Sequence, residues 1–378
     1  MADTALKTEE EKKEYFDSQD VLRTKAQKLA GWILQSNHFC AFTGAGLSTA
    51  AGIPDYRSGA NTVLPTGAGC WEKAANIQKA RKNGTLKNEP ATKAALRVGL
   101  TKAKATRSHL ALVELMEKGM LKHIISQNLD GLHRKSGIPA ANISELHGNS
   151  NLEVCIKCKR GYMRDFRVRT AQTTKEHKTG RKCDNKSCGG DLKDTVINFG
   201  ENLDAQILED GFNHGACADV MLVLGSSLRV NPACEMVGET ARHGGKVVIV
   251  NLQKTPYDNV AALVVHSKIE DFMMMLMEEL NMEIPKLTLK RWFNAKIEES
   301  KTGKETLKVN GITEDGSPYD IFKTIKIDGK VTNIHNLTEA QITNASTDFN
   351  LKFKFQGHYD EPELEVKLPR ELIKSNDS

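Results

Sequence analysis

Four short apolar runs constrain the fold most, because each ends directly in a glycine or a polar turn. They are residues 39–42, 122–126, 220–224 and 246–250. Segments with helical periodicity, such as 109–118 and 269–280, alternate with them, which is the pattern of strands joined by crossover helices. Open parallel sheets bind ligands at the carboxyl ends of their strands. The sequence therefore predicts an α/β fold with a doubly wound, Rossmann-like parallel sheet and one ligand-binding edge.

The chain has 378 residues, which is enough for more than one folding unit. We expect an N-terminal arm over residues 1–20, an α/β domain over 21–285, and a C-terminal β module over 300–370. In this last segment apolar and polar residues alternate at period two, between turn signals such as Asp315-Gly316 and Asp328-Gly329. No run of 18 apolar residues occurs, so a membrane helix is excluded. The polar N-terminus resembles no secretory signal, so we expect the chain to stay inside the cell.

Four of the eight cysteines form two closely spaced pairs. Two residues separate Cys155 from Cys158, and four separate Cys183 from Cys188. Inside the cell such pairs indicate a metal site more than disulfides, and four thiolates complete a tetrahedral zinc ion with no open position. We therefore predict a small inserted module over about 152–194 with one structural Zn²⁺. The other four cysteines lack such spacing and are expected to be buried or incidental thiols: Cys40, Cys70, Cys217 and Cys234.

A glycine-rich segment, residues 43–52, follows the first apolar run. Gly44 and Gly46 would let the backbone approach a pyrophosphate, and the amino terminus of a following helix favours negative charge. The fingerprint of hydride-transferring dehydrogenases needs Gly or Ala where this chain has Thr49, so a dinucleotide used for hydride transfer is poorly supported. Alone, the segment is equally compatible with a turn that binds nothing.

Polar side chains follow the second run. Gln127, Asn128 and Asp130 supply donors and an acceptor for a ribose or a carboxamide. His147 lies between leucine and glycine, and the ordinary histidine pKa of about 6.5 suits proton transfer near neutrality. Single histidines are more often structural, and that role is expected for His109, His133 and His243.

Positive charge is concentrated in an insertion over about residues 60–107. The whole chain has a net charge of +5, but residues 79–107 alone contain nine Lys or Arg and one acid. This segment is either a solvated insertion or a contact for a phosphate backbone or an acidic partner. No base-reading motif accompanies it, so any nucleic-acid contact is expected to be independent of sequence.

Seven motifs occur together in an order that resembles the sirtuins, the NAD-dependent protein lysine deacylases. The motifs are residues 44–57, 127–133, 145–149, the four-cysteine module, 199–201, 225–230 and 250–252. The resemblance covers roughly residues 20–285. Residues 143–149, 195–201 and 250–253 are most similar to the nuclear, chromatin-associated branch.

The resemblance implies roles for individual residues. It implies His147 as the general base, with Asn128 and Asp130 as its catalytic partners. Residues that would bind the co-substrate NAD are Gly44, Ala45, Gly46, Ile53, Asp55, Tyr56, Arg57, Gln127, Asn128, Asp130, Gly225, Ser226, Ser227, Asn251 and Leu252. Residues that would bind the acyl-lysine substrate are Ile197, Phe199, Gly200 and Glu201.

The implied reaction consumes NAD, frees the lysine, and releases nicotinamide and O-acyl-ADP-ribose. The resemblance also implies that the substrates are acylated lysines of proteins, histones among them. It implies a nuclear location, with the cytoplasm as the alternative. Two other hypotheses remain open. In the first, the same pocket transfers ADP-ribose onto a protein. In the second, the chain is a weakly active NAD-binding chromatin scaffold. The presence of Asn128, Asp130 and His147 argues against the scaffold, because a scaffold needs no catalytic residues. The C-terminal β module lies outside the resemblance and could offer an interaction surface.

Overall fold

A computed structural model describes most of the chain. The described residues are 6, 8–83, 103–171, 173, 175–185, 187–299, 305–312, 316, 321–333, 338–341, 348–356 and 361–373. They form two compact units. The first comprises Met1–Val154, Tyr162–Thr179 and Lys193–Thr288, and the second comprises Cys155–Gly161, Gly180–Leu192 and Leu289–Ser378.

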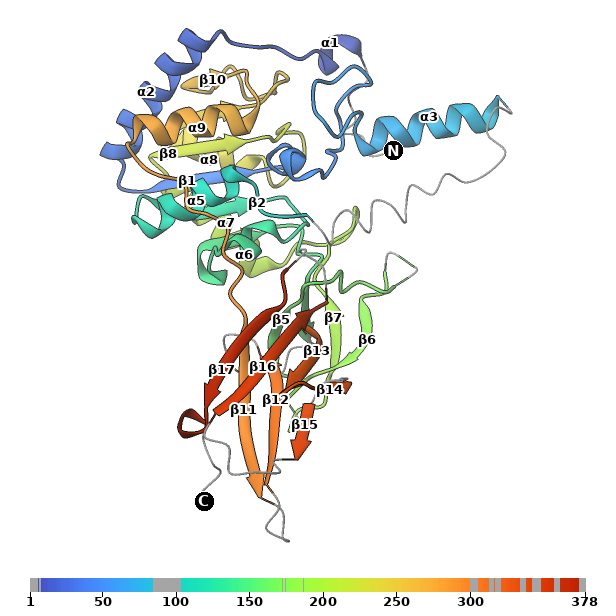
Figure 1. Cartoon of the computed structure of the whole chain (residues 1–378). Helices are drawn as coiled ribbons and strands as arrows, with labels where there is room; N and C mark the ends of the chain where they lie inside the picture. The colour runs from blue at the N-terminus through green and yellow to red at the C-terminus, as the bar shows by residue number, and fades with distance from the viewer. Residues whose placement is uncertain are drawn as a thin grey trace. The chain divides into compact units, whose positions relative to one another are not determined.

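A six-stranded sheet lies at the centre of the first unit (Figure 1). In sheet order its strands are β10 (Leu263–Val265), β9 (Lys246–Val250), β8 (Val220–Leu224), β1 (Phe39–Thr43), β2 (Leu121–Ser126) and β3 (Ile143–Glu145). All neighbouring strands are parallel. The direction of the strand order reverses between β1 and β8, which is the switch point where such sheets bind ligands. The predicted doubly wound, Rossmann-like sheet is confirmed.

Helices cover both faces of this sheet (Figure 1). On one face α2 (Gln19–Gln35), α5 (Arg107–Glu117) and α9 (Ile269–Glu279) pack in one apolar core, and on the other α7 (Ala205–Cys217) and α8 (Glu235–Arg242) pack in a second. Strand β8 contributes to both cores, because Leu222 faces the first and Met221 and Val223 face the second. Full burial on both faces explains why the central strands are continuous apolar runs in the sequence.

The first unit contains five further described helices. They are α1 (Glu9–Lys12), η1 (Ala45–Ala51), α3 (Cys70–Lys82), α6 (Leu132–Ser136) and η2 (Ala140–Asn142), η denoting a 3₁₀ helix. Residues 84–102, which are part of the predicted basic insertion, lie outside the described residues. Within the described ranges, no helix has both the length and the apolarity needed to cross a bilayer.

A small sheet carries the four paired cysteines. Its order is β5 (Gly161–Met163), β4 (Leu152–Cys155), β7 (Asp191–Asp194) and β6 (Lys178–Lys182). Cys155 is the last residue of β4, while Cys158, Cys183 and Cys188 lie in the turns that connect the strands. Short turns between strands thus bring the two pairs together.

The described residues in the C-terminal part of the second unit form two antiparallel sheets. One has the order β11 (Trp292–Glu299), β12 (Glu305–Ile312), β15 (Thr338–Gln341); the other has β14 (Lys330–Asn333), β13 (Phe322–Ile327), β16 (Asp348–Phe355), β17 (Leu364–Pro369). A final 3₁₀ turn, η3, spans Arg370–Leu372. Along β16, Phe349, Leu351, Phe353 and Phe355 are buried in the core shared by the two sheets. The period-two pattern therefore correctly predicted a C-terminal β-rich region.

Candidate functional site

A cavity of about 620 Å³ in the first unit lies at the carboxyl ends of β1, β2, β8 and β9. Its lining includes every residue that the sequence singled out for NAD, catalysis or substrate: Gly44, Ala45, Gly46, Ile53, Asp55, Tyr56, Arg57, Gln127, Asn128, Asp130, His147, Ile197, Phe199, Gly200, Glu201, Gly225, Ser226, Ser227, Asn251 and Leu252. The structure therefore brings these residues together. What each of them binds stays a prediction.

The turns after β1 and β8 lie in direct backbone contact. Gly46 donates its N–H to the carbonyl oxygen of Gly225, and Gly44 donates to Leu224. A Cβ on Gly44 would lie 2.6 Å from the Gly225 oxygen, and one on Gly46 would lie 2.8 Å from the Gly225 Cα. The absence of side chains thus leaves bare backbone at the cavity wall, which suits a pyrophosphate. The chain continues into a 3₁₀ helix, Ala45–Ala51, rather than the α-helix of a dehydrogenase turn.

The segment after this turn is held against the start of α3. Asp55 accepts hydrogen bonds at Oδ1 from the backbone N–H groups of Arg57 and Ser58. The N–H of Trp71 donates to the Tyr56 carbonyl, and the Arg57 guanidinium lies 4.5 Å from the centre of the Trp71 ring. Burial lowers the pKa of Arg57 to about 10. The stretch Gly69-Cys70-Trp71 at the start of α3 therefore anchors the predicted cofactor segment.

Three buried polar side chains meet at the floor of the cavity. The Ser48 hydroxyl donates to Oδ2 of Asp130 over 2.7 Å, and the Asn128 amide lies 3.4 Å from the Ser48 oxygen. Oδ1 of Asn128 is buried and accepts no hydrogen bond from the described residues. An unsatisfied buried acceptor costs about 1–3 kcal/mol, so a ligand that donates here would bind favourably. Sequence reasoning did not single out Ser48, although it lies inside the glycine-rich motif.

His147 presents one nitrogen to the cavity as a base. Its Nδ1 lies 3.1 Å from the backbone carbonyl oxygen of Gln127, which can only accept, so Nδ1 carries the hydrogen and Nε2 the lone pair. Burial lowers the pKa of His147, so the ring is neutral at pH 7. The next residue must be glycine: Gly148 has a φ of +78°, and a Cβ there would lie 1.8 Å from the carbonyl oxygen of Thr195.

The predicted substrate segment, residues 197–201, is attached to this histidine through the backbone. The N–H of Ile197 donates to the carbonyl oxygen of His147 over 2.9 Å. Phe199 is 69% exposed, and its ring lies 6.1 Å from the ring of Trp71 on the other side of the cavity. An exposed aromatic ring at a cavity rim gains most when a ligand covers it. The segment thus places an exposed apolar ring in the lining of the cavity that also contains His147.

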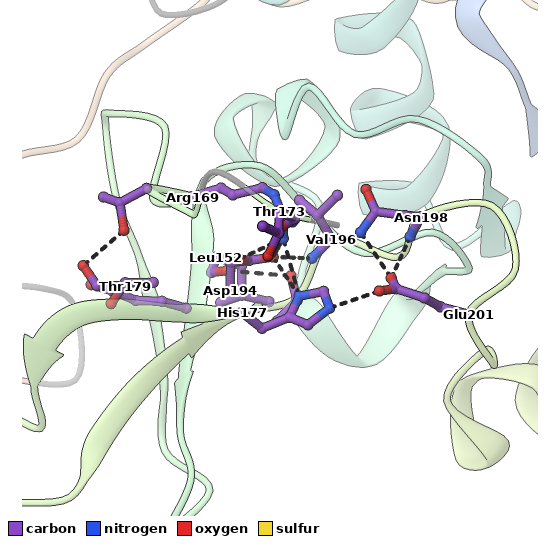
Figure 2. A network of polar contacts seen from close by, with 12 residues as sticks. Leu152, Arg169, Thr173, His177, Thr179, Asp194, Val196, Asn198 and Glu201 are labelled. Atoms are coloured by element: carbon purple, nitrogen blue, oxygen red, sulfur yellow. Dashed lines mark hydrogen bonds and ion pairs between the residues drawn. The ribbon is translucent and has the colours of Figure 1, made fainter. Parts of the chain in front are cut away.

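A network of charged groups holds the far end of that segment (Figure 2). Oε2 of Glu201 accepts from the backbone and side-chain N–H groups of Asn198, and Oε1 of Glu201 lies 3.1 Å from Nε2 of His177. Nδ1 of His177 lies 3.1 Å from Asp194, whose carboxylate also accepts from Arg169. These hydrogen bonds hold the pKa of Glu201 below its usual value. No local pattern in the sequence indicates this network, because its members come from separate segments.

The four paired cysteines form a second cluster. The four sulfur atoms lie within 4.8 Å of one another, and both Cys155–Cys188 and Cys158–Cys183 are 3.6 Å apart. A tetrahedral zinc ion with Zn–S bonds of about 2.3 Å sets its sulfurs about 3.8 Å apart. The donor set and spacing therefore fit a structural zinc ion with no open position.

The other histidines that the sequence considered are not at the cavity. His109 and His133 are buried, and burial lowers the pKa of each to about 3. The ring of His133 contacts the Thr43 hydroxyl over 2.9 Å, and His109 contacts Thr106 at the start of α5. His243 ends α8 and is exposed. Their contacts are those of structural histidines, as expected.

Comparison with known proteins places this site in a family. A model of the Sir2 family matches residues 44–232. The NAD-dependent protein deacetylase SRT1 of Arabidopsis thaliana is 37% identical over 95% of this chain and 74% of its own length. Mouse sirtuin-7, also named an NAD-dependent protein deacetylase, is 40% identical over 74% of this chain, which spans 65% of that protein. Drosophila melanogaster Sirt6 is 36% identical over 72% of this chain and 80% of its own length.

Solved structures agree with the sequence matches. The structure of Sir2Tm bound to a propionylated peptide is 30% identical, covers 68% of this chain and 100% of its own, and has a TM-score of 0.50. A structure of Sir2 bound to acetylated peptide gives the same identity, coverage and TM-score. The chain therefore belongs to the Sir2 family, the sirtuins, and the predicted resemblance is confirmed.

Proposed function

We propose that this protein is an NAD-dependent protein lysine deacetylase that releases nicotinamide and O-acyl-ADP-ribose. One observation carries the proposal: a single cavity joins a side-chain-free glycine turn, the unpartnered amide oxygen of Asn128 and the lone-pair nitrogen of His147. Membership of the sirtuins supports it, since the similar proteins named above are NAD-dependent protein deacetylases.

The cavity residues fit NAD. The lack of side chains at Gly44, Gly46 and Gly225 would let the diphosphate approach the cavity wall, and Asn251 with Leu252 would hold the adenosine half. The remaining predicted cofactor residues would surround the nicotinamide ribose: Ala45, Ile53, Asp55, Tyr56, Arg57, Gln127, Asn128, Asp130, Ser226 and Ser227. When bound, NAD supplies a sugar carbon from which nicotinamide departs as a neutral leaving group.

The chain's own groups perform the proton transfer and the positioning. His147 accepts a proton at Nε2 from a ribose hydroxyl, and its Nδ1–H bond to Gln127 fixes the ring for that task. Ser48 and Asn128 orient the polar floor. The segment from Ile197 to Glu201 pairs with the substrate peptide as an added strand, and Phe199 covers the acyl-lysine side chain.

The substrate is an acylated lysine in a protein, as in the peptide complexes of the similar Sir2 structures. We further propose histones or other nuclear proteins as the targets and the nucleus, rather than the cytoplasm, as the location. The similarity to sirtuin-7 and Sirt6 supports this choice. The nine basic residues within 79–107 suit a sequence-independent contact with nucleosomal DNA.

Mass spectrometry of the products tests the activity. The purified full chain, NAD and an acetyl-lysine peptide should give free lysine peptide, nicotinamide and O-acetyl-ADP-ribose in equal amounts. Protein labelled with ADP-ribose without any need for the acetyl group would instead indicate a transferase, and NAD binding without turnover would indicate a scaffold. Loss of a general base costs about 10²–10⁴-fold, so His147→Tyr should lose that much deacetylation. The matched change His243→Tyr, on the exposed end of α8, should lose none.

A further inference from the structure

A second group of side chains that could bind a metal lies at the end of the central sheet opposite the cavity described above. His38 immediately precedes β1, Cys40 is the second residue of β1, and His214 is in the last turn of α7. One nitrogen of each histidine and the sulfur of Cys40 all lie within 4.8 Å of one another. These residues are at the amino-terminal end of β1, whereas the NAD cavity is at its carboxyl end.

The distances suit one small cation. Nε2 of His38 and Nδ1 of His214 are 3.0 Å apart. A tetrahedral zinc ion with Zn–N bonds of about 2.0–2.1 Å holds two nitrogens about 3.3 Å apart, so the rings need to move by only a few tenths of an ångström. Without a metal, one ring donates its N–H to the other. With a metal, the ring that donates shifts its hydrogen to its other nitrogen, while the accepting ring keeps its tautomer, so that both facing lone pairs point at the ion.

The surrounding groups hold the ligands in place. The ring of His214 stacks on that of His123, with centroids 3.7 Å apart and planes 5° apart, while His123 contacts the Ser144 hydroxyl through Nε2. The backbone N–H of His38 donates to the carboxylate of Asp219. Stacking on His123 fixes the plane of the His214 ring, and Asp219 fixes the backbone at His38.

A further buried atom lacks a partner at this place. Nδ1 of His123 is buried and has no hydrogen-bond partner among the described residues, although the ring is 96% buried. Cys40 is the register partner of His123 on the adjacent strand and is itself fully buried.

We propose that His38, Cys40 and His214 form a second zinc site, separate from the four-cysteine cluster. Two imidazoles and a thiolate favour a borderline-soft cation such as Zn²⁺ over Mg²⁺ or Ca²⁺. Binding releases one proton, from the Cys40 thiol, and forms one Zn–S and two Zn–N bonds, with the fourth position left to water. The ion ties the start of β1 to the end of α7. The site is independent of the deacetylase assignment.

Zinc content and cobalt spectroscopy of the full chain test this site. After equilibration with buffered Zn²⁺, the wild-type protein should hold two zinc ions per chain. Cys40→Ala and His214→Gln should each hold one, which also shows that the four-cysteine cluster is intact and the variant folded. Two matched controls, Cys217→Ala on the same helix and His243→Gln, should hold two, because both residues are exposed.

Co²⁺ supplies a second readout. Added to protein whose four-cysteine cluster is filled with zinc, it should give a thiolate-to-cobalt absorption band that Cys40→Ala abolishes. His214→Gln should weaken Co²⁺ binding at least tenfold, and Cys217→Ala should leave it unchanged. One zinc per chain in the wild-type protein, or a second ion whose binding neither Cys40→Ala nor His214→Gln alters, would overturn the proposal.

Discussion

Nε2 of His177 lies 3.1 Å from Oε1 of Glu201, so the imidazole supports the far end of the predicted substrate segment. The other ring nitrogen lies 3.1 Å from Asp194, which Arg169 holds in turn (Figure 2). His177 is thus a positioning residue for the predicted substrate segment.

We expect His177→Ala to raise the KM for an acetyl-lysine peptide several-fold and to leave kcat within about twofold, because the loss affects binding and not the base. The measurement is steady-state kinetics at saturating NAD, with His243→Ala as the control. An equal loss in kcat with no change in KM would show that His177 acts on the chemical step instead.

Gly148→Ala tests how strictly the position beside the base is fixed. The new Cβ would meet the Thr195 carbonyl at 1.8 Å, so the backbone that carries His147 must move. We expect kcat/KM to fall by at least 10²-fold, since small displacements of catalytic groups have costs of that size. Gly119→Ala is the matched control: its φ is +71° but nothing lies within 4 Å, so it should lose only about 1–2 kcal/mol of stability and no activity.

The pH dependence of kcat/KM follows from the burial of His147. Because burial lowers its pKa below the ordinary value of about 6.5, the ring stays neutral to a lower pH than in an unfolded chain. Activity should therefore be full at pH 7 and fall through a midpoint below 6.5. The same shift affects the free energy of unfolding. As the pH falls below 6.5, the unfolded chain takes up a proton at His147 before the folded chain does, so the folded state loses stability until the pH passes the lowered pKa. A midpoint above pH 7 would assign the base to another group.

Removal of the zinc ligands tests the four-cysteine cluster. Cys183→Ala should remove one equivalent of zinc and lower the melting temperature, because a structural zinc ion contributes to folding directly. Cys217→Ala, an exposed cysteine outside the cluster, should keep the metal and the wild-type melting temperature. Metal analysis beside thermal denaturation decides the outcome, and full zinc content in Cys183→Ala would refute the assignment.

The central strands could be predicted because their environment is uniform. Val220–Leu224 and Lys246–Val250 are continuous apolar runs with buried neighbours on both faces, and the structure has them at the predicted bounds. The edge strands Ile143–Glu145 and Leu263–Val265 are three residues long, too short for a periodic signal, and were not predicted.

Parts of the sites escaped prediction for a different reason. His38 and His214 are 176 positions apart, so their contact depends on how α7 packs against β1 and not on any local pattern. Ser48 lay inside a recognised motif, but only the folded chain shows its hydroxyl on Asp130. Spacing in the sequence identifies ligands that share one turn, as in the four-cysteine module, and it misses those that meet only through packing.

Gly46 and Gly225 each occupy the space that a methyl group on the other would need, with atoms 2.6–2.8 Å from the position of that group. A side chain introduced at either position therefore cannot be accommodated by a smaller residue at the other, because the other is already glycine. No second-site change within this pair can rescue a first, and so two turns almost half the chain apart must remain glycine together.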